Sequence, residues 1–249
     1  RSIFFMKDAL KPFFFSSDQL LKLSESTRKT YEHAYPFPHT YFDNFLPKSL
    51  AKELADNFPD FKDPCWIRRS KTHRFQQEKL KIHDEEKMPA LIRHVLNQFN
   101  SATFLKFLEN LTGINGLIPD PYFHGAGLHQ IEKGGHLGIH VDFNWNEKLR
   151  LDRRLSVLLY LNEDWKEEYG GHLELWNQDV TKCEVKLLPI LNRIVIFTNF
   201  DYSWHGHPDP MTCPEGRSRK SLALYYYTNG SYYRHRTQYH LRPGEKIKR

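Results

Sequence analysis

Cysteine is scarce in this sequence, which has only Cys65, Cys183 and Cys213 among its 249 residues. The three are widely separated, odd in number and include no Cys-X-X-Cys pair, which argues against a disulfide framework and a zinc–thiolate site. This usage favours a reducing compartment, so we expect a cytoplasmic protein. Long apolar runs are lacking too, and no segment is long enough to span a membrane or to form the core of a signal sequence.

Positive charge exceeds negative charge only modestly in this sequence. The net charge is +6 with a pI near 9.1, and part of the surplus lies in the tail, residues 242–249. Such an excess favours anionic partners without identifying one. No aromatic-and-basic recognition motif accompanies the tail, so a solvated tail is favoured over a nucleic-acid contact. The hydrophobic share of 39% and charged share of 27% are those of a globular protein, and the length fits a single domain.

Helical signals are concentrated in the first half of the chain. Ser16 to Asp18 resembles a helix cap, and residues 47–58 place Leu50 and Leu54 on one face before Pro59. Two further helices are expected at 88–99 and 101–111, the second ended by a glycine. Residues 60–86 are charged and irregular, so we expect a surface loop, with a mobile lid as the alternative.

The pattern changes to a period of two after residue 125. Short runs of alternating residues, separated by turn residues, favour an antiparallel sandwich or barrel. The expected strands are 128–131, 137–142, 153–161, 172–176, 183–188, 193–198 and 219–228. The sequence therefore predicts helices first, followed by a β domain.

A His-X-Asp pair, His140 and Asp142, lies within one of these strands. Side chains two residues apart on a strand point to the same face, so this pair offers an imidazole and a carboxylate to one point. A second histidine from a distant strand would complete the site, and His205 is the candidate, with His207 as its competitor. Two histidines and one carboxylate on one face suit non-haem Fe(II), because they leave open coordination positions.

A basic residue follows on the last expected strand. Arg219, Ser221 and Ala223 share one face, and the two small residues leave space beside the arginine. A guanidinium is a planar fork of donors suited to a carboxylate, so Arg219 is a candidate to bind the far carboxylate of a dicarboxylic cosubstrate. Arg217 has the same parity and is the competitor.

Several motifs in one order resemble the 2-oxoglutarate and Fe(II)-dependent oxygenases, specifically their prolyl 4-hydroxylase-like branch. The resemblance runs from residue 134 to residue 227, and residues 36–50 (PFPHTYFDNFLPKSL) resemble the start of the same proteins. The small residue and the proline after His205 match the family's offsets and favour it over His207. The motifs in order are His140-Val-Asp142, 154–162, Asp164-Trp165, Gly170-Gly171, Phe197, His205 and Arg219.

The resemblance implies a mainly β fold with N-terminal helices, built on a double-stranded β-helix (jelly roll). It implies Fe(II) held by His140, Asp142 and His205, and 2-oxoglutarate bound through its C5 carboxylate by Arg219 with help from Tyr160. Dioxygen and, in this family, ascorbate complete the expected cofactors. One departure concerns a tyrosine that family members often carry shortly before the His-X-Asp strand. Here Gln130 stands in that neighbourhood, and we expect it to serve as a substitute donor.

The expected organisation is an N-terminal extension (1–35), a single oxygenase domain (36–241) and a basic tail (242–249). Within the domain, helices are expected at about 47–112 and the β-helix at about 125–230. The predicted function is hydroxylation of an unactivated C–H bond, prolyl or proline-like, in a peptide or small molecule, with release of succinate and CO2. The alternatives are a zinc hydrolase using the same three ligands and a non-catalytic binding module. Candidate cavity walls, for which plain core is the favoured interpretation, are Leu137, Leu159, Leu175 and Phe197.

Overall fold

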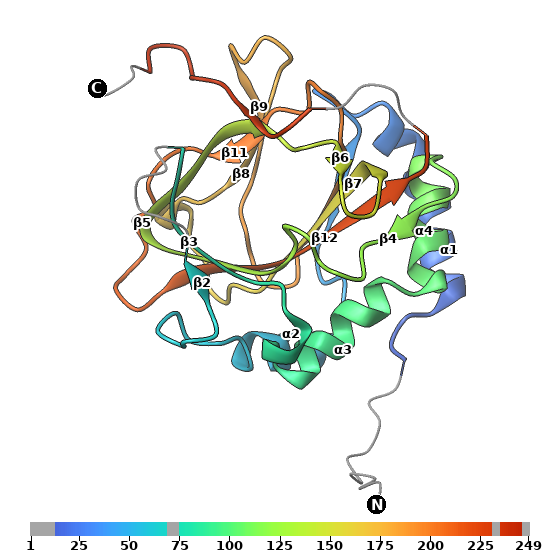
Figure 1. Ribbon diagram of the computed structural model, residues 1–249, viewed down its shortest axis with the longest axis horizontal. Helices are drawn as coiled ribbons and strands as arrows, with labels where there is room; N and C mark the ends of the chain where they lie inside the picture. The colour runs from blue at the N-terminus through green and yellow to red at the C-terminus, as the bar shows by residue number, and fades with distance from the viewer. Residues whose placement is uncertain (1–12, 69–74, 231–234, 246–249) are drawn as a thin grey trace, which may run out of the picture.

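A single antiparallel sheet that curls on itself dominates the computed structural model, which describes residues 13–68, 75–230 and 235–245 (Figure 1). The strands are β1 (His39–Phe42), β2 (Ile67–Arg68), β3 (Gln76–Ile82), β4 (Ile118–Pro119), β5 (Gly127–Val141), β6 (Trp145–Asn146), β7 (Leu151–Tyr160), β8 (Leu173–Trp176), β9 (Cys183–Leu187), β10 (Ile194–Thr198), β11 (His205–His207), β12 (Ser218–Thr228) and β13 (Gln238–Tyr239). Their main spatial order is β1-β10-β7-β12-β5-β11-β8-β9, so strands distant in sequence lie side by side.

Helices cover one side of the curled sheet (Figure 1). They are α1 (Ser17–Glu32), α2 (Lys48–Asp56), α3 (Ala90–Phe99) and α4 (Ala102–Thr112). The side chain of Ser16 accepts a hydrogen bond from the first turn of α1, and Ser101 does the same for α4. Gly113 ends α4 at a φ of 72°, a left-handed conformation that glycine adopts without strain. None of the helices in the described ranges is long and apolar enough to cross a membrane.

The first helix shares the core of the protein. Helix α1 packs against α4, and the Tyr31 hydroxyl is hydrogen-bonded to Thr198 of β10 at 2.8 Å. Phe15 stacks on Phe104 of α4 with ring centroids 5.2 Å apart. The segment assigned from sequence to an N-terminal extension therefore contains a helix that packs on the β-rich part.

Alternation along β7 and β12 separates the helix-covered core from the interior of the curled sheet. The positions that face the helices are apolar, whereas the intervening positions carry the polar groups that matter for chemistry. The helix-facing set is Leu155, Val157, Leu159, Leu222, Leu224 and Tyr226, and the interior set includes Ser156, Tyr160, Arg219, Ser221 and Tyr225. The expected fold class, mainly β with N-terminal helices on a double-stranded β-helix, is confirmed.

The expectation of an irregular surface loop at residues 60–86 is wrong for residues 76–82, and residues 69–74 of that stretch lie outside the described part of the chain. Residues 76–82 form β3, which pairs antiparallel with β5 from Gln76 opposite Leu137 to Ile82 opposite Leu128. Its sequence, QQEKLKI, is polar at most positions, so it lacks the apolar alternation by which strands are recognised. The two strands expected at 128–131 and 137–142 are likewise one continuous strand, β5.

Candidate active site

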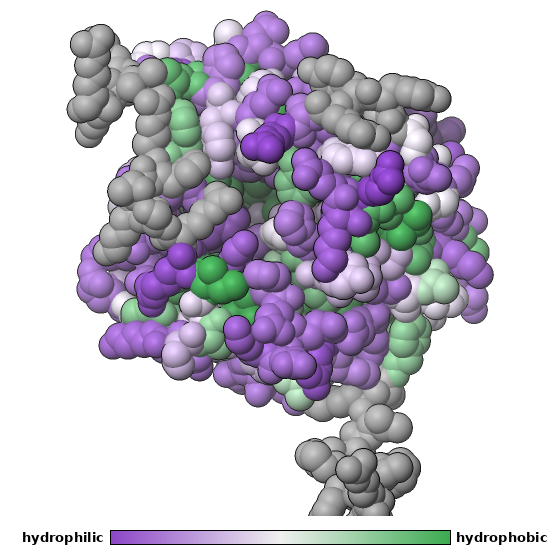
Figure 2. Space-filling view, in the orientation of Figure 1, coloured by the Kyte–Doolittle hydropathy of each residue, from purple (hydrophilic) through white to green (hydrophobic). Residues whose placement is uncertain are grey.

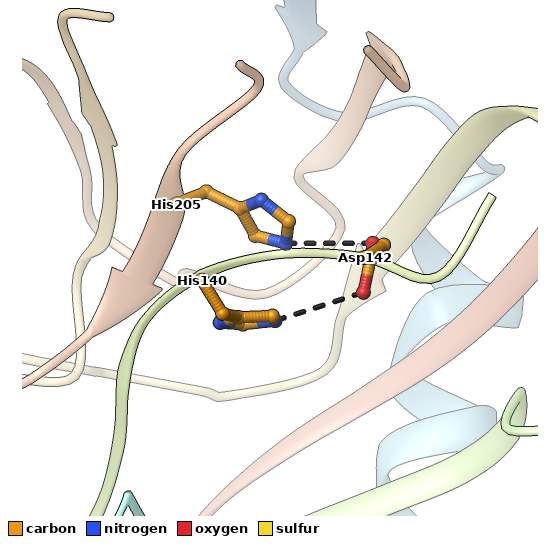
Figure 3. Close-up of side chains that lie close together, drawn as sticks. All are labelled: His140, Asp142 and His205. Carbon is orange, nitrogen blue, oxygen red and sulfur yellow. Dashed lines mark ion pairs between the residues drawn. The ribbon is translucent and has the colours of Figure 1, made fainter. Parts of the chain in front are cut away.

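Three potential metal ligands converge at one end of β5. His140 of β5 and His205 of β11 are direct cross-strand partners, with ring centroids 4.4 Å apart. Asp142 follows His140 by two residues and lies on the same face. Its Oδ1 is 3.6 Å from His140 Nε2, and its Oδ2 is 3.5 Å from His205 Nε2 (Figure 3). The ligand atoms of all three lie within 4.8 Å of one another, a spacing that suits a single ion.

Both imidazoles are oriented as metal ligands usually are. His140 Nδ1 is 2.8 Å from the Gly138 carbonyl oxygen, and His205 Nδ1 is 2.8 Å from that of Ser203. A carbonyl oxygen only accepts, so each Nδ1 carries the proton and each Nε2 offers a lone pair to the site. Burial lowers the pKa of His205 to about 4, so this ring is neutral at pH 7, as a ligand must be. The donor set fits Fe(II).

Arg153 fixes the orientation of the Asp142 carboxylate. Its Nη2 donates to Asp142 Oδ2 at 2.6 Å and to Ser156 Oγ at 2.8 Å. The guanidinium stacks on Tyr225, with its Cζ 3.3 Å from the ring centroid. Burial by itself raises the pKa of Asp142, but Arg153 and then the two histidines hold it well below its usual value. Asp142 is therefore ionised and oriented before any metal binds.

The guanidinium of Arg219 lies in the interior of the curled sheet. Its Nε donates to the Gly171 carbonyl oxygen at 2.7 Å, and its Nη2 donates to the Tyr160 hydroxyl oxygen at 3.0 Å. Among the described residues Nη1 has no hydrogen-bond partner, and the Tyr160 hydroxyl accepts from Arg219 and keeps its own proton to donate. Burial raises the pKa of Tyr160 against the opposing charge of Arg219, so the proton stays in place at pH 7. These donors fit a carboxylate.

Two adjoining cavities meet at the metal-ligand cluster. The inner cavity contains Arg219 and His207, whereas the outer one contains residues of β3 together with Thr237 and Tyr239. Leu137 and Phe197, two of the candidate wall residues, line the inner cavity. The other two do not, because Leu159 faces the helices and Leu175 packs in the interior cluster. The residues common to both cavities are Lys79, Leu137, His140, Asp142, Arg153 and Tyr225.

His207, the competitor of His205, lies on the same face of β11 but outside the ligand cluster. It lines the inner cavity and is 3% exposed. Burial, and then the charges of Arg219 and Lys79, lowers the pKa of His207 well below its usual value. His205 is thus the histidine that the structure brings to Asp142.

Two other residues named from the sequence lie away from this site. The Gln130 side chain points out of the cavity, where its Oε1 accepts from Ser218 Oγ at 2.7 Å. Its neighbours on β5, His129 and Ile131, face the cavity instead. Gln130 therefore cannot serve as the substitute donor from this position. Arg217 donates to the Glu163 carbonyl oxygen and lines a separate pocket, so it does not compete with Arg219.

Sequence reasoning missed Arg153 and Lys79. Arg153 lies seven positions before Tyr160, so strict alternation from Tyr160 places it on the opposite face, and only the pairing of β7 shows that it reaches Asp142. Lys79 lies on the unpredicted strand β3. Near its start β7 has two adjacent arginines, and the sequence gives no signal that singles out the buried Arg153 from Arg154.

A jelly roll that brings two histidines, one carboxylate and a buried arginine to one cavity suits a mononuclear non-haem metal site. Residues 126–227 match the family described as the 2OG-Fe(II) oxygenase superfamily. This segment contains all three metal-ligand candidates and Arg219, so the resemblance expected from the sequence is confirmed. The expected 2-oxoglutarate-dependent dioxygenase, with Fe(II) and 2-oxoglutarate as cofactors, is confirmed.

Solved structures share the fold at low sequence identity. A Trichoplax adhaerens prolyl hydroxylase, in complex with a hypoxia inducible factor peptide fragment, matches with a TM-score of 0.58 and 18% identity, over 85% of this chain and 90% of that one. A Pseudomonas putida prolyl-4-hydroxylase matches with a TM-score of 0.56 and 17% identity, over 84% and 100%. A prolyl 4-hydroxylase from Phytophthora capsici gives 0.52 and 18%, over 88% and 68%.

Proposed function

We propose that this chain hydroxylates an unactivated C–H bond of a prolyl or proline-like substrate, in a peptide or a small molecule. One oxygen atom of O2 enters the substrate and the other enters succinate, which leaves with CO2 when 2-oxoglutarate is decarboxylated. The observation that carries the proposal is the pairing of the His140, Asp142 and His205 cluster with Arg219 in one cavity. The likeness to three prolyl hydroxylase folds supports the choice of substrate.

Each proposed role rests on an atom that the fold leaves available. His140 and His205 offer Nε2, and Asp142 offers its ionised carboxylate, as Fe(II) ligands. Arg219 and Tyr160 offer donors to the C5 carboxylate of 2-oxoglutarate. When bound, iron, 2-oxoglutarate and dioxygen supply the oxidising chemistry, while the protein orients the reactants and excludes water.

The outer cavity is the proposed substrate site. It includes His140 and Asp142 but not Arg219, and its walls combine aromatic rings with polar groups. Phe143, Tyr225 and Tyr239 present ring surfaces, which suit the apolar faces of a pyrrolidine ring. The face of the protein drawn in Figure 2 is mainly hydrophilic, with scattered hydrophobic patches.

Domain organisation and location are part of the same proposal. We propose one oxygenase domain over residues 36–241, with α1 packed on it and a basic tail after it. Cys65, Cys183 and Cys213 are all free in the structure. This supports a reducing, cytoplasmic location.

Succinate release in the presence of candidate substrates tests the proposal. Free proline and a panel of proline-containing peptides are incubated with the iron-loaded protein, 2-oxoglutarate and ascorbate, and products are examined by mass spectrometry. We expect at least one substrate to gain one oxygen atom in step with succinate release. Asp142→Ala should abolish both signals. Succinate release that no proline compound stimulates would contradict the choice of substrate and leave the reaction type intact.

A further inference from the structure

His207 is a buried histidine that the proposed iron and 2-oxoglutarate contacts do not use. It ends β11, two residues after His205, so both rings project from the same face of the strand. It lines the inner cavity together with Arg219, and it is 3% exposed. Neither ring nitrogen has a hydrogen-bond partner among the described residues. A buried polar group without a partner is costly, which points to a ligand that completes it.

Four histidines line the described part of the inner cavity, and three of them have their N–H group engaged. In His140 and His205 the Nδ1–H donates to a backbone carbonyl oxygen. His129 Nε2 lies 3.0 Å from the Gly125 carbonyl oxygen and therefore carries the proton there. Burial, and then the nearby lysines, lowers the pKa of His129 well below its usual value, so its Nδ1 is an acceptor. His207 alone of these four has an uncommitted N–H.

The charged residues around His207 indicate whether the ligand that completes its hydrogen bonding is an anion or a cation. Arg219 and Lys79 line the same cavity, and the charges of both act on the His207 ring. The one carboxylate among the residues that line this cavity, Asp142, is already paired with Arg153. The Arg219 guanidinium and an N–H donor facing one space suit an anion with several acceptor lone pairs, and a carboxylate has four.

We propose that His207 donates a ring N–H to the carboxylate of 2-oxoglutarate that Arg219 binds. This rests on the proposed role of Arg219. His207 is then a third anchor beside Arg219 and Tyr160, and it supplies from β11 a donor that Gln130 on β5 is not placed to give.

Binding of 2-oxo acids to the iron-loaded protein under anaerobic conditions tests the role of His207. The ligands are 2-oxoglutarate and 2-oxopentanoate, which lacks the second carboxylate. His207→Leu should raise the Kd of 2-oxoglutarate about 10–100-fold, the effect of losing a hydrogen bond to a charged group. The Kd of 2-oxopentanoate should stay unchanged, and His207→Gln, which keeps an N–H donor, should recover most of the loss.

The matched control is Gln130→Leu, which removes a buried hydrogen-bonding side chain that points away from the same cavity. It should leave the Kd of 2-oxoglutarate close to that of the wild type. Equal weakening of both ligands by His207→Leu would show that the ring acts through packing, and no weakening would show that it makes no contact. Either result overturns the role of His207. Absence of binding to the wild type would instead overturn the proposed cosubstrate site.

A measurement on the unsubstituted protein covers the case in which His207→Leu does not fold. In zinc-loaded protein with isotope-labelled histidine, 2-oxoglutarate should slow the solvent exchange of one further imidazole N–H, observed by NMR. The resonance should be missing in His207→Gln. 2-Oxopentanoate should not produce it. A set of imidazole signals that is the same with both ligands would contradict the proposal.

Discussion

Gly171 supports Arg219 so closely that a single methyl group should disturb 2-oxoglutarate binding. Its carbonyl oxygen accepts from Arg219 Nε at 2.7 Å. A Cβ atom at this position would lie 3.0 Å from Arg219 Cδ and 2.8 Å from Met211 Sδ. Met211 is flexible and can move aside. Arg219 is held by hydrogen bonds to Gly171 and Tyr160, so it cannot move without changing what it presents to the cavity.

The size of the effect follows from these contacts. Relief to an ordinary contact of 3.4 Å requires about 0.4 Å of movement at Cδ (3.4 − 3.0), and more at the guanidinium beyond it. A hydrogen bond to a charged group contributes about 1.5–3 kcal/mol. Loss of one such bond corresponds to about a 10–100-fold rise in Kd. Gly171→Ala should therefore weaken 2-oxoglutarate binding at least about tenfold.

Gly170→Ala is the matched control for this substitution. Gly170 has a φ of +69° and Gly171 a φ of +71°, so alanine is strained at both positions, by about 1–3 kcal/mol each. A Cβ at Gly170 meets nothing within 4 Å. Anaerobic titration of the iron-loaded proteins with 2-oxoglutarate gives the two Kd values, and thermal unfolding gives the two stabilities. Similar losses of stability with equal Kd values would refute the link from Gly171 to Arg219.

Three further predictions follow from buried polar groups. Arg153→Met leaves Asp142 without its buried partner, so the metal-free protein should lose about 3–5 kcal/mol of unfolding free energy in denaturant titrations, against little change for an exposed lysine substitution. The folded-state pKa of His129 lies below its unfolded value of 6.5, so the unfolded state binds more protons as the pH falls below 6.5. Stability should then fall by up to about 1.4 kcal/mol per pH unit through this residue, and His129→Gln should flatten that slope. Mn(II) at about 100 times its Kd should stabilise the chelator-treated protein by about 2.7 kcal/mol, an effect absent in His140→Ala.

Much of the fold could be predicted from the sequence because helix caps and strand alternation depend on only a few neighbouring residues. The cap at Ser16 and the glycine at position 113 mark helix ends through hydrogen bonds and φ values that any context would require. The His-X-Asp pair follows from the two-residue period of a strand. Its position opposite His205 is a matter of register between β5 and β11, which only the family's order of motifs indicated.

The placement of Gln130 shows where alternation stops being a guide. Counting by two from His140 puts Gln130 on the cavity face, yet Ile131 lines the cavity and Gln130 does not. The alternation of inward and outward side chains along β5 therefore shifts by one residue between Gln130 and His140. In this stretch the pairing of β5 with β3 is irregular near Gln77. Such a change depends on the neighbouring strand, and β3 carries too little apolar alternation to be recognised from sequence.

Anaerobic addition of Fe(II) and 2-oxoglutarate to the purified protein tests the central claim most directly. A 2-oxo acid chelated to Fe(II) in such a site gives a weak visible charge-transfer band. The band should appear in the wild type and be lost in Asp142→Ala and, at limiting 2-oxoglutarate, in Arg219→Ala. Iron binding without any band would contradict the assignment of the site to 2-oxoglutarate.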